Sequence, residues 1–158
     1  MISYAAAMRT SLLLALVLIA CGGKSDRSKA EGLVRDILKG HGVPATPVCP
    51  DSGYAVGTVI QCTATDSLGS KLVFDIAIEK DKFRGTFAGA IVDANTVKTE
   101  ARRLVNDPYA ELAYPHPTLL VPSGMTVTLD VNTAASVRKL GIREKDPAKH
   151  TIDIALAP

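Results

Sequence analysis

The sequence predicts an α+β fold in which a helix packs on an antiparallel sheet (αβββ). An amphipathic stretch at 28–39 is followed by three strand-like stretches, the same order of patterns recurs in the second half, and two cysteines, Cys49 and Cys62, lie beside the first strands. With 158 residues, of which 47% are hydrophobic and 22% charged, the chain has enough apolar material for one compact domain or two small ones.

The charge balance argues against a nucleic-acid partner. Lys and Arg total 18 against 16 Asp and Glu, the net charge is +2, and no run of five basic residues occurs. The chain also lacks a nucleophile elbow, an H-E-x-x-H pair, a Walker loop and a dinucleotide-binding glycine run. We therefore expect no nucleic-acid partner, no cofactor and no catalytic residues.

The first segment, 1–20, has the pattern of a signal peptide. Its apolar run from Leu12 to Ala20 is unbroken but only nine residues long, and a membrane-spanning helix needs about 20. Arg9 supplies the basic flank, and either Met1 or Met8 could be the start of the protein. The chain is therefore expected to be exported.

The residues Leu18-Ile19-Ala20-Cys21 resemble the lipobox of bacterial lipoproteins. The resemblance implies cleavage before Cys21, a diacylglyceryl group on its thiol and an acyl chain such as palmitate on its amine, which together anchor a protein stably to a bilayer. The alternative is an ordinary signal peptide with a chance cysteine. Residues 21–28 are expected to form a flexible tether, and the protein to sit on the cell membrane or the outer membrane, facing the periplasm or the exterior.

With Cys21 lipidated, Cys49 and Cys62 remain in a chain sent to an oxidising compartment, so we expect them to form a disulfide. The turn-rich residues 50–53 between them allow a local reversal of the chain. A zinc site would need two further ligands, and neither His41 nor His116 has metal-ligand spacing to the cysteines. We therefore expect no metal.

The first unit, 29–93, should contain a helix and a meander of strands. The helix at 28–39 has apolar residues at helical spacing and ends at Gly40. Strands are expected at 46–49, 57–65, 71–79 and 83–92, and the alternation within 71–79 predicts one buried face.

The second unit, 94–158, repeats this order as a degenerate copy or resembles it by chance. We expect a helix at 96–106, strands at 119–121, 125–131 and 151–156, and a short helix at 134–140. A shift of 67 residues superimposes the apolar stripes of the two helices and places Cys49 on His116 and Cys62 on Leu129. The second unit would then have apolar packing in place of the disulfide.

The contexts of the two cysteines, Val48-Cys49-Pro50 and Cys62-Thr63-Ala64, with Gly57 and Gly69, resemble a family of small bacterial secreted and lipoprotein modules known only as a domain of unknown function. The resemblance covers about 33–79, a third of the chain, and implies an αβββ fold at the cell envelope but no reaction. Tandem modules of this kind also resemble, in architecture alone, secreted β-lactamase inhibitor proteins and small outer-membrane assembly lipoproteins, which bind proteins.

The proline-rich segment 108–117 is the most unusual stretch of the mature chain. Its prolines favour a stiff, extended conformation, so Tyr109, Tyr114 and His116 could form a partner-binding loop. The alternative is a linker between the two units, with the tyrosines packed on its edge.

These patterns together predict a lipid-anchored envelope lipoprotein that acts as a non-enzymatic binding or assembly module for an envelope protein or a cell-wall partner. The alternatives are an envelope hydrolase and an inhibitor of an envelope enzyme. A deep pocket that holds His116 and a buried carboxylate would favour the hydrolase. Exposed tyrosines or apolar patches would favour recognition.

Overall fold

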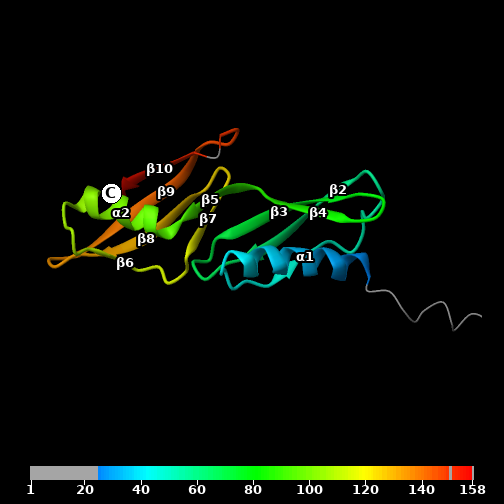
Figure 1. Cartoon of the computed structure of the whole chain (residues 1–158), viewed down its shortest axis with the longest axis horizontal. Helices are drawn as coiled ribbons and strands as arrows, with labels where there is room; N and C mark the ends of the chain where they lie inside the picture. Colours follow the sequence, from blue (N-terminus) through cyan, green and yellow to red (C-terminus); the bar gives the residue numbers. More distant parts are fainter. Residues whose placement is uncertain (1–24, 150, 158) are drawn as a thin grey trace, which may run out of the picture.

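The computed structural model describes residues 25–149 and 151–157. The signal segment 1–20, Cys21 and most of the tether lie outside the described residues. The described part has the expected α+β fold, with two helices packed on antiparallel sheets. Figure 1 shows an elongated molecule in which two units of similar design lie along the long axis, joined by the strands β5 and β7.

The first unit packs one helix on a four-stranded sheet. The strand order is β1-β2-β3-β4, and all neighbours are antiparallel. The elements are α1 (Asp26–Gly40), β1 (Pro47–Val48), β2 (Val59–Thr65), β3 (Lys71–Ile78) and β4 (Phe83–Phe87).

The helix α1 begins two residues before the predicted position, because Ser25 caps it by accepting a hydrogen bond from the Ser28 backbone N–H. Residues 26–28 of the predicted tether are therefore helical. Ala30, Val34 and Leu38 form its fully buried stripe and face the sheet. The spacing of three and four residues is the amphipathic pattern of the sequence.

The second unit has the same order of elements: a helix, a short strand and three longer strands. Its sheet runs β10-β9-β8-β6, which is the order of the first sheet read from the opposite edge. The elements are α2 (Ala94–Val105), β6 (Glu111–Leu112), β8 (Thr126–Asn132), β9 (Val137–Asp146) and β10 (Thr151–Leu156).

A two-stranded ribbon joins the two units. It pairs β5 (Gly89–Asp93) with β7 (Thr118–Pro122) in antiparallel register. Leu120 is buried in the core of the first unit, whereas its neighbours Leu119 and Val121 are buried in the core of the second. Because successive side chains of a strand point to opposite faces, this single strand links both cores.

Two of the predicted elements are wrong. The strand expected at 83–92 is broken at Ala88, and its halves β4 and β5 belong to different sheets. The short helix expected at 134–140 does not form: 133–136 is a turn closed by a Thr133 N–H bond to the Ser136 carbonyl, and β9 follows. Leu140 and Ile142 are buried on the same face of β9, a spacing of two that suits a strand and not a helix.

The pairing registers match the two sheets residue by residue. Cys62 lies opposite Phe74 in the first sheet, as Leu129 lies opposite Leu140 in the second. The short strands shift the comparison, however, because Pro47 pairs with Ala64 and Leu112 with Val131. The position of Cys49 therefore corresponds to Tyr114, two residues before the His116 that a uniform shift of 67 predicts. The second unit has lost two residues between its helix and its first strand.

Candidate functional site

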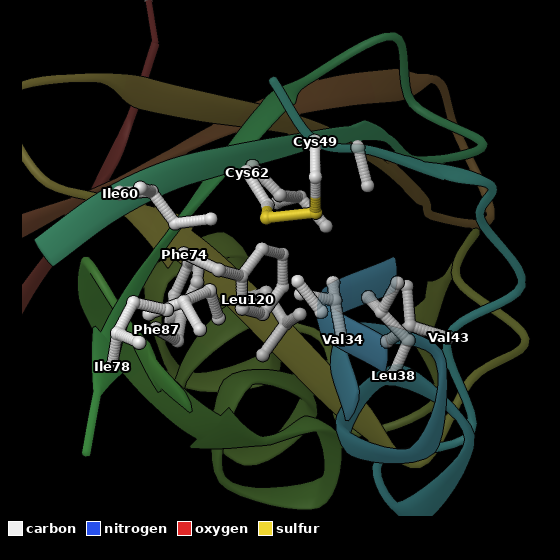
Figure 2. Packing of buried hydrophobic residues seen from close by; sticks show 14 residues of the cluster. Val34, Leu38, Val43, Cys49, Ile60, Cys62, Phe74, Ile78, Phe87 and Leu120 are labelled. Atoms are coloured by element: carbon white, nitrogen blue, oxygen red, sulfur yellow. A yellow bond between two sulfur atoms is a disulfide. The ribbon is translucent and has the colours of Figure 1, made fainter. Parts of the chain in front are cut away.

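The predicted disulfide between Cys49 and Cys62 is present, with an S–S distance of 2.00 Å. Both cysteines are buried, and Figure 2 shows the bond within the apolar cluster that contains Val34 and Leu38 of α1 and Phe74 of β3. It joins the residue just after β1 to the middle of β2, so it fixes the edge of the first sheet.

The start of α1 is tied to the same corner of the molecule. Glu31 accepts a hydrogen bond from the Arg27 Nε at 2.8 Å and one from the Cys49 backbone N–H at 3.4 Å. The bond from Arg27, despite an opposing effect of burial, lowers the pKa of the Glu31 carboxyl. The ionised carboxylate thus links the helix to the disulfide strand.

The segment 108–117 does not form one extended loop. It contains β6, and it places its two tyrosines in different surroundings. Tyr109 is 87% exposed on the turn after α2, where its N–H bonds to Asp107 Oδ1. Tyr114 and His116 lie together, with an edge-to-face contact of 5.3 Å between ring centroids. The structure therefore brings together two of the three residues of the predicted loop.

Tyr114 is a packing residue of the second core. Its hydroxyl donates a hydrogen bond to the Thr118 carbonyl at 2.9 Å. Burial, and to a smaller extent the charge of Asp66, raises the pKa of this hydroxyl to about 12.

A pocket of about 440 Å³ lies where His116 meets the C-terminal end of α1. Its floor is apolar, Arg35 and Lys39 stand at its rim, and His116 Nε2 lies 3.4 Å from Ser67 Oγ. Within the described residues its lining includes no carboxylate, so the feature that would favour a hydrolase is not found there. The lining residues are Arg35, Leu38, Lys39, Gly42, Val43, Pro44, Ala45 and His116.

A larger hollow, of about 730 Å³, lies between α2 and β10. Half-buried Ile152 and Ile154 line it from the strand, and polar side chains line it from the helix. Its charges are paired: Glu100 accepts from Arg103 Nε at 2.9 Å, and Asp153 accepts from Arg143 at 3.0 Å. The lining residues are Asn95, Thr96, Thr99, Glu100, Arg103, Ile152, Asp153 and Ile154.

Sequence reasoning missed this hollow, although a signal for it exists. The shift that superimposes the two helices places Glu100 on Leu33, so an aliphatic side chain of α1 is replaced by a charged one on α2. Opposite it, the registers place Ile154 at the position of Gly85. The helix and its edge strand have exchanged the large and the small residue, which changes the shape between them.

Other charged groups noted in the sequence are engaged locally. Asp75, on the mixed face of β3, accepts a hydrogen bond from Gln61 at 3.0 Å, and Glu79 forms an ion pair with Arg84 at 3.1 Å. On α2, Arg102 donates to the Ala110 carbonyl and Arg103 binds Glu100. These contacts are typical of a solvated surface.

Among residues 25–149 and 151–157, no three His, Cys, Asp or Glu side chains gather closely enough to hold a metal ion. None of the described helices combines the length and the apolar character that crossing a bilayer requires.

No family model, curated protein or solved structure matches the chain. The resemblances to lipoproteins and to the cysteine-containing module therefore stay predictions from the residues themselves.

Proposed function

We propose that this protein is a lipid-anchored, non-enzymatic binding module of the bacterial cell envelope. The observation that carries the proposal is the buried disulfide between Cys49 and Cys62 in a chain that also has a lipobox at Cys21. A structural disulfide forms and persists in an oxidising compartment, which is where a lipoprotein signal delivers its chain. The two features are independent and agree on the location.

The geometry of the first unit suits a position close to a membrane. Cys21 precedes the start of α1 by five residues, a distance of at most about 18 Å in an extended chain. Figure 1 shows that α1 starts at the outer end of the first unit, remote from the second unit. A chain anchored through Cys21 would hold its first unit near the bilayer and extend its second unit away from it.

The surface of the second unit supports binding. The hollow between α2 and β10 combines half-buried aliphatic side chains with polar walls, a combination common in recognition sites. It lies in the unit that would face outward from the membrane, where a partner could reach it.

Membrane fractionation of cells that produce the Cys21→Ala variant tests the anchor. The wild-type protein should sediment with membranes, and the variant should appear in the soluble fraction. The Ser28→Ala variant, changed beyond the lipobox, is the matched control and should stay with membranes. Retention of the Cys21→Ala variant in the membrane fraction would refute lipid anchoring.

A further inference from the structure

We infer that the hollow between α2 and β10 binds an uncharged, extended segment of a partner protein, which adds a strand to the free edge of β10. The inference deepens the proposed function, on which it rests for the exposure of the second unit and for the orientation of the chain. Three features of the described residues carry it: the backbone of β10, the contrast with the first unit and the paired charges.

The first feature is the open edge of the sheet. Within the described residues, β10 is the last strand of its sheet and pairs only with β9. Ala157 donates its N–H to the Lys139 carbonyl at 2.9 Å. Because backbone groups alternate in direction along an antiparallel strand, those of Asp153 and Ala155 also face β9. The N–H and C=O groups of Ile152, Ile154 and Leu156 therefore point away from the sheet, toward the place of an added strand.

The second feature is the contrast with the first unit. There α1 closes on the edge strand β4: a Cβ on Gly85 would lie 2.8 Å from Ile37 Cδ1 and 3.3 Å from Leu33 Cδ2. At the matching place in the second unit, the aliphatic position of Leu33 is taken by Glu100, whose side chain turns to Arg103. The space between helix and strand is left open. What fills it in the first unit is aliphatic, so an aliphatic side chain is what this geometry accepts.

The third feature is electrostatic. The two carboxylates at the hollow, Glu100 and Asp153, each have an arginine partner, Arg103 and Arg143. A charged ligand group would have to compete with these pairs, whereas an uncharged segment would not. Backbone hydrogen bonds to β10 would give affinity, and aliphatic side chains at every second position would reach the hollow beside Ile152 and Ile154.

A second copy of this chain fits less well than a partner segment. Antiparallel pairing of β10 with β10 of another copy would turn one molecule end for end, because α1 and β10 both run roughly along the long axis (Figure 1). The two starts of α1 would then point in opposite directions. Two copies anchored in one membrane through Cys21 could not adopt that arrangement.

The test is a selection from a phage-displayed library of random twelve-residue peptides on the lipidated protein in detergent micelles. We expect enrichment of uncharged peptides with apolar residues at every second position. The Ile154→Pro variant should bind the enriched peptides at least tenfold more weakly, because proline removes the outward N–H without removing a bond to β9. The Ile154→Val variant, which keeps that N–H, is the matched control and should bind within about twofold of wild type.

A second variant protects the test against misfolding. Thr99→Trp fills the hollow from the helix and leaves the strand intact, so it should also weaken binding at least tenfold, whereas Thr99→Ser should not. The inference would be overturned by no enrichment, by peptides that bind both blocked variants as well as wild type, or by concentration-dependent dimerisation that Ile154→Pro abolishes. Because the selection is done in micelles, it is independent of the Cys21→Ala fractionation and distinguishes failure of the site from failure of the anchor.

Discussion

The two units share one arrangement of elements but stabilise it differently at the same point of the sheet. In the first unit, Cys49 on the residue after the short strand is bonded to Cys62 on the next strand. In the second, the registers place Tyr114 and Leu129 at these positions, and both pack in the second core. A covalent bond and a packed aromatic residue thus serve the same edge, which shows that the topology does not depend on the disulfide.

A second difference lies between each helix and its edge strand. The first unit places Leu33 and Ile37 against Gly85, and the second leaves a hollow beside Ile154. The sheet and its buried face are the same in both units, so the difference is confined to a surface that folding does not require. A surface of this kind is free to acquire a binding role.

The largest effect is expected at the joint that makes the comparison possible. A Cβ on Gly89 would lie 2.2 Å from the Val121 backbone carbonyl, so Gly89→Ala must disrupt the pairing of β5 with β7. We expect a loss of more than about 4 kcal/mol in the free energy of unfolding, measured by chemical denaturation. The same change at Gly32, where nothing lies within 4 Å, should instead stabilise α1 by about 0.5–1 kcal/mol. A Gly89→Ala protein as stable as wild type would contradict the close approach at the joint.

The next effect compares the two ways of fixing the sheet edge. Replacing both Cys49 and Cys62 with Ala should cost about 3 kcal/mol for a cross-link over a sequence separation of 13. Leu129→Ala in the second unit should cost a similar amount, about 2–5 kcal/mol, because Leu129 is fully buried. Adding reductant should destabilise the wild-type and Leu129→Ala proteins and leave the cysteine-free variant unchanged. Equal sensitivity of all three proteins to reductant would show that the disulfide is not what stabilises the first unit.

A smaller effect is expected at Tyr114. The Tyr114→Phe variant loses the hydrogen bond to the Thr118 carbonyl and should be about 1 kcal/mol less stable near neutral pH. The pKa of Tyr114 is raised in the folded protein to about 12, above its ordinary value of 10.0. Above pH 10 the unfolded chain loses this proton more readily than the folded one, so the stability that the hydroxyl contributes is present below pH 10 and lost as the pH rises toward 12.

Urea denaturation of both proteins between pH 8 and about 11.5 measures this difference. Burial also raises the pKa of Tyr54, which both proteins retain, so only the change in the gap between them reports on Tyr114. The gap should narrow above pH 10. A gap that is constant over the whole range would contradict the burial of the Tyr114 hydroxyl.

The smallest effect is expected at Tyr109, the third residue of the predicted loop. Its side chain is 87% exposed, so Tyr109→Ala should change the free energy of unfolding by less than about 0.5 kcal/mol. A larger loss in chemical denaturation would mean that Tyr109 packs against the second unit and that the turn after α2 differs from the one described.

Those elements whose pattern is set by their own residues could be predicted from the sequence. Both helices show apolar spacings of three and four, β3 alternates along its whole length, and the disulfide followed from export and the count of cysteines. The break after β4 could not be predicted in this way. It depends on Gly89 lying against the carbonyl of Val121, a contact with a strand more than 30 residues later in the chain.

The other errors have equally specific causes. The outer face of β9 carries Arg138, Lys139 and Arg143, and these charges hide the alternation that Leu140 and Ile142 mark on the inner face. The loss of two residues before β6 moves Tyr114, and not His116, to the place of Cys49, and a comparison at one fixed shift cannot detect such a loss. The hollow beside β10 was missed because it arises from a difference between the units and not from a motif.

Photocrosslinking in intact cells tests most directly the claim that the two units have diverged into a supporting unit and a binding unit. A photoreactive phenylalanine derivative placed at Thr99, on the helix wall of the hollow, should give discrete light-dependent species of higher mass. The same residue at Gly32, which the shift of 67 residues places at the equivalent position of α1, should give none. Crosslinks of equal strength from both positions, or none from Thr99, would contradict the account.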